Sequence, residues 1–214
     1  MNNQALLRAF DDLDAGGTTA ADVGSGVGRV VGLLRSRGLS VVGCELDPVK
    51  AATAGVDAAD ARLWSPSHPV DVVTCVELVE HLPHADHLPL VERMASWLTP
   101  TGALVLSTPQ RHSVVAWTER AFHVATRRGP YQWWDPTHVS VSTRRYWERL
   151  FREAHLDVSR RVGIHLVSDV VVQAVPALER LQHSVHSGPV ALVAFDLVWV
   201  LRPAGRAGAA RPEG

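Results

Sequence analysis

The chain has 214 residues, of which 46% are hydrophobic and 20% are charged, and its formal net charge is −1 at pH 7. This composition is typical of one soluble globular domain and argues against a disordered, collagen-like or coiled-coil chain. The near-neutral charge gives no general attraction to nucleic acid or to an anionic membrane. Such a partner would need a local basic patch, for which Arg127-Arg128 and Arg144-Arg145 are the candidates, but we expect both pairs to be solvated surface arginines.

The terminal segments and the cysteines predict a cytoplasmic protein without a membrane partner. The start of the chain lacks a basic segment followed by a long apolar core, and no apolar run reaches the roughly 18 residues of a membrane span. Cys44 and Cys75 show no Cys-x-x-Cys spacing, so we expect reduced core thiols. We expect a single domain over residues 1–202 and a disordered tail over residues 203–214, which are rich in Ala, Gly, Arg and Pro.

Strands and helices are predicted to alternate along the chain. The strands expected from apolar runs cover, in chain order, residues 20–23, 40–44, a short part of 56–63, 70–76, 103–107, 157–162 and 191–201. The helices expected from apolar stripes cover residues 2–13, 27–38, 48–54, 84–98, 114–125 and 143–155, and residues 99–102 are expected to form a turn. This order predicts an α/β fold with a doubly wound, mostly parallel seven-stranded sheet and helices on both faces.

The least regular part of the chain lies at residues 109–141. An amphipathic helix is followed there by the aromatic sequence Tyr131-Gln132-Trp133-Trp134-Asp135-Pro136. Insertions near strand ends often carry substrate contacts, so we interpret this segment as a helical lid. A packed surface subdomain is the alternative.

The first strand leads into Asp22-Val23-Gly24-Ser25-Gly26-Val27-Gly28. Alternating glycines permit positive φ angles and the close approach of a ligand to the backbone. The dinucleotide fingerprint G-x-G-x-x-G would need glycine at position 29, where Arg29 stands. This spacing favours S-adenosylmethionine (SAM) over NAD, and an ordinary strand-to-helix turn is the alternative.

Acidic residues follow the next strands in a regular order. Glu45 comes seventeen residues after Gly28, Asp60 follows, and Asp71-Val72-Val73-Thr74-Cys75-Val76-Glu77 forms the fourth strand. A carboxylate at the end of the second strand suits a ribose diol, because it can accept hydrogen bonds from both hydroxyls. Asp47 is the second choice for this contact, although a helix cap before Pro48 is the simpler role for it.

Over roughly residues 15 to 160 this order resembles the class I SAM-dependent methyltransferases, which have a Rossmann-like fold. The resemblance implies that Asp22 holds the glycine loop near the methionine end of SAM, that Glu45 binds the ribose and that Asp60, with Asp57 as its rival, binds the adenine amine. The cofactor-binding set is then Asp22, Gly24, Ser25, Gly26, Gly28, Glu45, Leu46, Asp60, Ala61 and Cys75.

The sequence Glu77-Leu78-Val79-Glu80-His81 follows the fourth strand. It resembles the Glu-x-x-Glu-His segment of ubiquinone-pathway O-methyltransferases and of small-RNA 3′-terminal 2′-O-methyltransferases, where it supports a divalent metal or a catalytic base. We expect catalysis without a metal here, because many small-molecule enzymes of this fold carry a similar Glu-His-Leu run without one. The alternative is a divalent ion held by Glu77, Glu80, His81 and His138.

His81, His138 and Glu77 are the predicted catalytic residues. An imidazole near neutral pKa can take a proton as a hydroxyl attacks the sulfonium methyl, and His81 follows the strand-end carboxylates directly. His138 is the other candidate base, or a fourth metal ligand, and a loop histidine that caps the next helix is the alternative role for it.

We therefore expect SAM-dependent methylation of a small molecule, with S-adenosylhomocysteine as the second product. A hydroxyl oxygen is the favoured acceptor, because the chain lacks the Asn/Asp-Pro-Pro-Tyr/Phe sequence of amino-DNA methyltransferases and no proline precedes Cys75. The pathway expected is cofactor or specialised-metabolite biosynthesis. The alternatives are an RNA 2′-O-methyltransferase, disfavoured by the neutral charge, a non-catalytic SAM-fold regulatory module, and another SAM- or NAD-dependent reaction.

Overall fold

The computed structural model describes residues 17–126, 135–167, 171–172, 175–182 and 184–205. The helix predicted over residues 2–13, the pair Arg127-Arg128, most of the aromatic loop and residues 206–214 of the predicted tail lie outside this range.

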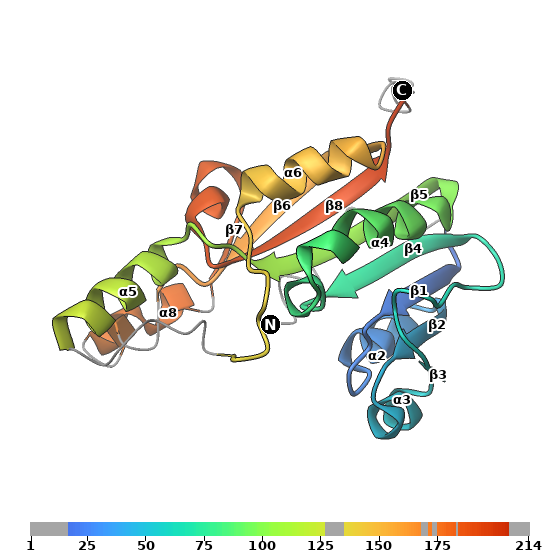
Figure 1. Cartoon of the computed structure of the whole chain (residues 1–214), viewed down its shortest axis with the longest axis horizontal. Coiled ribbons are helices and arrows are strands. Elements are labelled where there is room, and N and C mark those ends of the chain that lie inside the picture. The colour runs from blue at the N-terminus through green and yellow to red at the C-terminus, as the bar shows by residue number, and fades with distance from the viewer. Residues whose placement is uncertain (1–16, 127–134, 168–170, 173–174, 183, 206–214) are drawn as a thin grey trace.

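One sheet organises the described chain, with the strand order β3-β2-β1-β4-β5-β8-β6-β7 (Figure 1). The strands from β1 to β5 pair in parallel, whereas β8 is antiparallel to both β5 and β6, and β7 is antiparallel to β6. Their bounds are β1 Thr19–Val23, β2 Ser40–Glu45, β3 Asp57–Ala58, β4 Val70–Val76, β5 Leu98–Pro109, β6 Leu156–Ile164, β7 Val185–His186 and β8 Asp196–Pro203.

Helices connect the strands and cover the sheet. The α-helices are α2 Arg29–Ser36, α3 Pro48–Ala54, α4 His84–Ser96, α5 Val114–Thr126, α6 Arg144–Glu153 and α8 Glu179–Gln182. Short 3₁₀ helices occupy η1 Val79–His81, η2 Pro176–Leu178 and η3 Gly188–Val193. None of the helices in the described part of the chain is both long enough and apolar enough to cross a bilayer.

Alternating side chains of the strands feed two hydrophobic clusters, one on each face of the sheet. Ala20 of β1 lies in the cluster that includes α2, and its neighbour Ala21 lies in the cluster that includes α4 and α6. This alternation follows from the two-residue period of a strand. The fold is therefore the predicted doubly wound, Rossmann-like α/β fold, and α5 lies to one side of its layers (Figure 1).

Three differences between the structure and the sequence predictions are larger than a shift of one or two residues at the end of an element, such as Leu98 beginning β5 and Pro203 ending β8. The sheet has eight strands because the two-residue β7 adds an edge, and so short a strand gives no sequence pattern. Residues 99–102 do not form a turn but belong to β5, which accommodates them by an irregularity in its pairing with β4. The first part of the strand predicted over residues 191–201 lies in η3, and β8 begins only at Asp196.

The topology brings several chain segments to one edge of the sheet. The parallel strands β1 and β4 end at Val23 and Val76 as neighbours, so the glycine loop and the segment after β4 leave the same edge. The antiparallel β8 starts at this edge, because its first residue, Asp196, pairs with Pro109 at the end of β5. Open α/β sheets bind ligands at the carboxyl ends of their parallel strands.

Candidate functional site

The glycine loop after β1 has a backbone that only glycine adopts without strain. The φ angles of Gly24, Gly26 and Gly28 are +73°, +54° and +84°. A Cβ atom at Gly24 would lie 2.9 Å from the Leu78 side chain, and one at Gly28 would lie 2.8 Å from the Ala54 backbone. At Gly26 a Cβ would lie more than 4 Å from every heavy atom of the described residues outside its own chain neighbours. Two of the glycines thus fit the loop against the protein, whereas the third leaves an open face.

Glu45 ties the end of β2 to this loop. Its Oε2 accepts a hydrogen bond of 2.9 Å from the Gly26 N–H, and its Oε1 accepts one of 3.0 Å from the Asp47 N–H. A carboxylate has about four acceptor sites, so two remain for other donors. Because Glu45 is only half-buried, it keeps the capacity to accept from a diol at the open face of the loop.

Asp22 lies beneath the loop and is 1% exposed. Its Oδ1 accepts a hydrogen bond of 2.5 Å from the Thr74 hydroxyl, while its Oδ2 is buried and has no partner among the described residues. Desolvation by burial raises the pKa of Asp22 from 3.8 to about 6. A cationic ligand beside this carboxylate would restore the ionised form, because opposite charges attract strongly where water is excluded.

The other residues predicted to bind the cofactor differ in burial and in their hydrogen-bond and ion-pair partners. Asp47 caps α3 by accepting hydrogen bonds from the Val49 and Lys50 N–H groups, which is the alternative role named for it. Asp60 forms an ion pair of 2.6 Å with Arg62. Of the other four predicted residues, Asp57 accepts a hydrogen bond from the Trp64 indole, Leu46 is exposed, and Ala61 and Cys75 are buried in the core.

Glu77 stands at the turn that follows β4. Its φ angle of +52° is unusual for a residue with a side chain and redirects the chain into η1. Its Oε1 accepts a hydrogen bond of 2.8 Å from the Ser107 hydroxyl on β5. Burial, together with the charges of Asp196 and Glu80, raises the pKa of Glu77 well above its ordinary value of 4.5.

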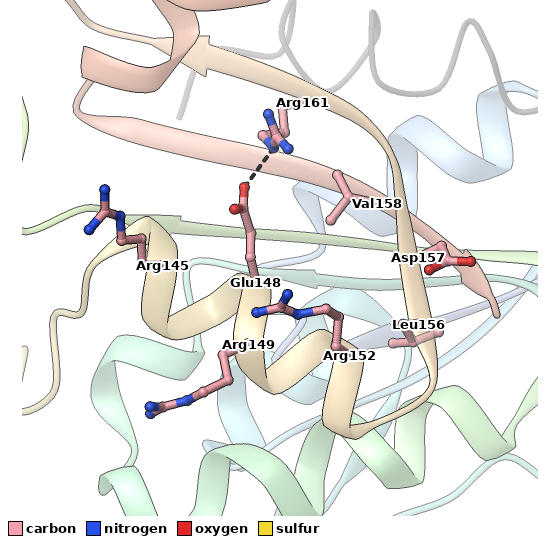
Figure 2. A pocket seen from close by; sticks show the side chains of 8 residues that line it. All are labelled: Arg145, Glu148, Arg149, Arg152, Leu156, Asp157, Val158 and Arg161. Carbon is pink, nitrogen blue, oxygen red and sulfur yellow. Dashed lines mark ion pairs between the residues drawn. The ribbon is translucent and has the colours of Figure 1, made fainter.

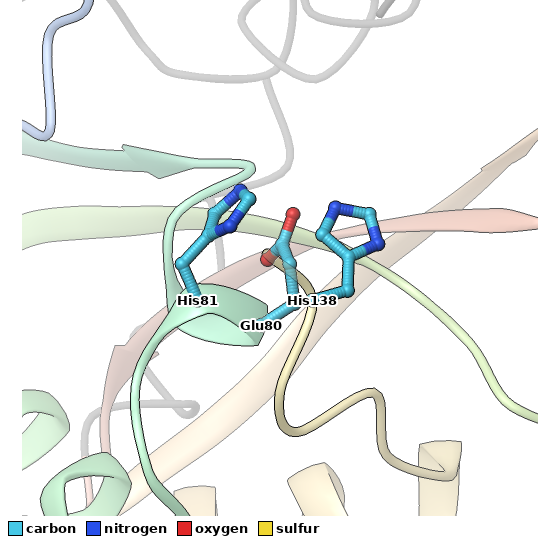
Figure 3. Close-up of side chains that lie close together, drawn as sticks. All are labelled: Glu80, His81 and His138. Atoms are coloured by element: carbon cyan, nitrogen blue, oxygen red, sulfur yellow. The ribbon is translucent and has the colours of Figure 1, made fainter. Parts of the chain in front are cut away.

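Glu80, His81 and His138 converge at the same edge (Figure 3). One possible ligand atom from each lies within 4.8 Å of the others. Glu80 is fully buried, and neither of its carboxylate oxygens has a hydrogen-bond partner of good geometry among the described residues. Desolvation raises the pKa of Glu80 from 4.5 to about 7. This arrangement could hold a divalent ion, although Glu77, the fourth predicted ligand, is not part of the group.

The backbone explains how residues so far apart in sequence meet. The carbonyl oxygen of Glu80 accepts hydrogen bonds from the N–H groups of Val139 and Ser140, at 2.9 and 3.1 Å. The fully buried His87 lies nearby, with Nε2 2.9 Å from the Val79 carbonyl and 3.0 Å from the Ser140 hydroxyl. These contacts join η1 to the segment that carries His138, and the rings of His81 and His138 lie 4.8 Å apart.

One acidic residue of the site was missed by the sequence analysis. Asp196 is the first residue of β8 and is 4% exposed. Its Oδ2 lies within hydrogen-bond distance, 2.8 Å, of the His165 Nδ1. Its charge contributes to the raised pKa values of Glu77 and Glu80. The sequence placed Asp196 inside a predicted strand, so only the antiparallel pairing with β5 shows that it reaches the ligand edge.

A basic groove lies elsewhere, between α6 and β6 (Figure 2). Its volume is about 410 Å³, and Arg145, Arg149, Arg152 and Arg161 line it together with Glu148 and Asp157. Glu148 holds Arg144 at 2.6 Å and Arg161 at 2.7 Å. Of the pair Arg144-Arg145, Arg145 lines this groove, whereas Arg144 is paired with Glu148.

Comparisons with known proteins agree with this architecture. A family model described as a methyltransferase domain matches residues 3–160. A search of curated proteins finds no match. A SAM-dependent methyltransferase from Archaeoglobus fulgidus is 16% identical, with 93% of this chain and 92% of that chain covered and a TM-score of 0.64.

Two further solved structures share the fold. The O-methyltransferase of a trans-AT polyketide synthase multienzyme from Brevibacillus brevis, in complex with S-adenosylhomocysteine, is 16% identical, with 94% of this chain and 72% of that chain covered and a TM-score of 0.62. The small RNA methyltransferase HEN1 is also 16% identical, with 98% of this chain but 26% of that chain covered and a TM-score of 0.65. The matched family model spans most of the chain, and the chain therefore belongs to the class I SAM-dependent methyltransferases.

Proposed function

We propose that this enzyme transfers the methyl group of SAM to a hydroxyl oxygen of a small molecule in the synthesis of a cofactor or specialised metabolite. The observation that carries the proposal is that an imidazole, His81, lies at the same sheet edge as the glycine loop. The O-methyltransferase of the polyketide multienzyme shows that this fold serves such chemistry in another protein.

The residues of the glycine loop fit the donor. The Asp22 Oδ2, for which the described residues offer no partner, suits the positive charge of SAM. The open face at Gly26 leaves room for SAM beside the backbone of the loop. Glu45 keeps acceptor capacity for the ribose hydroxyls. We extend the donor site to Asp60 for the adenine amine, which requires Arg62 to share or release the Asp60 carboxylate.

The residues after β4 fit the acceptor. SAM supplies a methyl group on a positively charged sulfur, which is an excellent leaving group, so the protein must position the acceptor and remove one proton. In our proposal His81 takes that proton, while Glu77 and His138 border the acceptor. Burial lowers the pKa of His138 and thereby favours its neutral form.

Methyl transfer from labelled SAM to a panel of phenols, alcohols and amines tests this proposal. His81→Gln should lower kcat by about 100-fold, the usual contribution of a general base, and should leave the Kd for SAM unchanged. His68→Gln is the matched control, because His68 is exposed in a loop, and should retain wild-type activity. Full activity of His81→Gln, or transfer to amines alone, would contradict the proposal.

A second candidate is metal-assisted methylation of an RNA 2′-hydroxyl. The cluster of Glu80, His81 and His138 favours it, since two imidazoles and a carboxylate are suitable ligands for a divalent ion. The basic groove offers a surface for phosphates, and the small RNA methyltransferase HEN1 shares the fold.

Chelation separates the two candidates. In the metal-assisted candidate, EDTA and Glu80→Gln each abolish transfer to RNA, and added divalent ions restore it only in the wild-type protein. In the small-molecule candidate, EDTA leaves transfer unchanged and RNA is not methylated. Charge reversal in the groove, Arg145→Glu with Arg152→Glu, should weaken RNA binding only in the first case.

A further inference from the structure

The ring of His81, the proposed base, has polar contacts with Thr137 and also faces the His138 ring of the same segment. The Nδ1 atom of His81 lies 2.8 Å from the Thr137 hydroxyl oxygen and 3.2 Å from the Thr137 carbonyl oxygen. Thr137 is exposed and lies 56 residues further along the chain. Nothing in the sequence pattern pairs these two positions.

The contacts decide where the proton of the neutral His81 ring lies. A carbonyl oxygen can only accept a hydrogen bond, so the Nδ1 that faces it must carry the hydrogen. A neutral imidazole has one N–H group, so Nε2 then has the free lone pair. A protonated nitrogen neither takes a proton nor binds a metal, and Nε2 is therefore the reactive atom in either candidate chemistry.

Asp135 makes the hydroxyl contact consistent with this assignment. The Thr137 hydroxyl donates to the Asp135 Oδ1 at 2.5 Å, and the Thr137 N–H donates to the same oxygen at 2.8 Å. Because its single hydrogen goes to Asp135, the hydroxyl oxygen is an acceptor toward His81. The hydrogen bonds from Thr137 also lower the pKa of Asp135, so this carboxyl stays ionised and can only accept.

We propose that Thr137 and Asp135 are positioning residues that hold neutral His81 with its hydrogen on Nδ1 and its lone pair on Nε2. The inference rests on the proposed function of His81 as the base. As the acceptor oxygen bonds the methyl carbon, the sulfur–methyl bond breaks and its electron pair returns to sulfur. The acceptor proton moves to Nε2, so the positive charge passes from sulfonium to imidazolium and the charges balance.

Backbone hydrogen bonds fix the position of the Asp135–Thr137–His81 relay relative to the rest of the site. Val139 and Ser140, two and three residues after Thr137, donate to the Glu80 carbonyl oxygen next to His81. The His138 N–H donates to the Asp135 carbonyl oxygen at 3.1 Å. The segment thus approaches His81 as one hydrogen-bonded unit, in the way that partners behind a catalytic imidazole fix its orientation.

Nitrogen-15 NMR of the full-length wild-type protein tests the assignment directly. Two-bond proton–nitrogen couplings distinguish the two neutral ring forms, and the spectrum is recorded about two pH units above the ordinary histidine pKa of about 6.5. The His81→Gln spectrum identifies the His81 signals. We expect the hydrogen on Nδ1. A wild-type ring with its hydrogen mainly on Nε2 would overturn the inference.

Variants then connect the ring form to catalysis. Thr137→Val keeps the carbonyl contact but removes the hydroxyl, so the population with hydrogen on Nε2 should rise several-fold and kcat should fall about 10- to 100-fold. The Kd for SAM should not change. Thr137→Ser restores the hydroxyl and should recover most of both values. Thr53→Val, at an exposed threonine whose hydroxyl donates to the Val49 carbonyl, is the control that should change neither.

The two readouts separate failure of the inference from failure of the proposed function. If Thr137→Val leaves both the ring form and kcat at wild-type values, the positioning role is refuted while the base role of His81 stands. If Thr137→Val changes the ring form but leaves kcat unchanged, the relay exists and His81 is not the base. A loss of kcat in Thr137→Val that Thr137→Ser does not recover would also refute the positioning role.

Discussion

The proposed donor and acceptor regions of this methyltransferase are built in different ways. The donor region consists of neighbours in sequence: Asp22 to Gly28 form one loop, and Glu45 reaches the Gly26 N–H from the next strand. The acceptor region joins η1 to residues 135–140, so its contacts cross more than fifty residues. Backbone conformation thus shapes the first region, whereas long-range hydrogen bonds assemble the second.

The two regions also differ in how their buried charges are compensated. Asp22 has one hydrogen-bonded oxygen and one oxygen that finds no partner in the described part of the chain, beside an open loop. The acceptor region gathers Glu77, Glu80 and Asp196, and its nearby bases are histidines. A cation is therefore favoured in the donor region, and a proton or metal ion in the acceptor region. Variants that affect one region and spare the other test this division.

The largest effect is expected for Gly26→Val in the donor region. A branched side chain would occupy the open face of the loop, so the Kd for SAM should rise by more than about 1000-fold, or about 4 kcal/mol. Gly38→Val is the matched control, since Gly38 also has a positive φ angle, +85°, and open space around its Cβ. Both variants should lose similar stability, and only Gly26→Val should lose binding in calorimetry. Wild-type affinity in Gly26→Val would remove the pocket assignment.

His87→Ala is expected to damage the acceptor region next. The His87 ring is fully buried, contacts η1 and Ser140, and stacks on Trp147 at 4.6 Å. Losing these contacts and leaving a cavity should cost roughly 3 kcal/mol of unfolding free energy, measured by urea denaturation. Below the unfolding transition kcat should fall while the Kd for SAM stays constant. A parallel loss of SAM affinity would show that the regions are not separable.

An effect of intermediate size is expected in how the free energy of unfolding depends on pH through Asp22. Its carboxyl is protonated in both the folded and the unfolded chain below pH 3.8, and burial raises its folded pKa to about 6. As pH rises between these values the unfolded chain ionises first, so the folded state loses about 3 kcal/mol, and the loss is complete above about pH 6. Asp22→Asn should abolish this dependence in urea denaturation of the SAM-free protein.

SAM should show the opposite pH trend in binding. The cation favours ionised Asp22, so as the pH falls below about 6 the Kd for SAM should rise by up to about tenfold per pH unit. Asp22→Asn should bind more weakly and should show a flat profile over the same range. Calorimetric titrations from about pH 5 to pH 8 measure both profiles. A wild-type Kd independent of pH would place the SAM cation away from Asp22.

Asp47→Ala should have the smallest effect. Asp47 accepts hydrogen bonds from the Val49 and Lys50 N–H groups, so its loss removes an N-cap worth about 1 kcal/mol in thermal unfolding. The Kd for SAM should change less than twofold, because Glu45 keeps its bond to Gly26. A change in the Kd above tenfold would show that Asp47, and not Glu45, makes the ribose contact.

The sequence predicted the donor half of the molecule more completely than the acceptor half. The glycine spacing, the capping Asp47 and the strand β4 depend on local preferences, and the structure has α3 at Pro48–Ala54 and β4 at Val70–Val76 as predicted. The SAM dependence inferred from this spacing is confirmed by the family match. The cofactor contacts of the individual residues stay predictions.

The acceptor half depends on pairings that no local pattern encodes. Asp196 reaches the site because β8 runs antiparallel between β5 and β6, and Thr137 reaches His81 because residues 137–140, at the end of the segment predicted as a lid, contact η1. The predicted turn at residues 99–102 was wrong for a related reason: these residues lie in β5 between Leu98 and Ala103, which pair with Val70 and Val72 of β4, and this long-range register shift gives no local sequence pattern. Of the four candidate metal ligands, three converge and Glu77 contacts Ser107 instead.

A crystal structure of the enzyme with SAM tests the division into donor and acceptor regions most directly. We predict the SAM ribose on Glu45, its positive charge beside Asp22, and its methyl group directed toward His81 across the shared sheet edge. A SAM molecule bound away from the glycine loop, or a methyl group directed away from His81, would contradict the account.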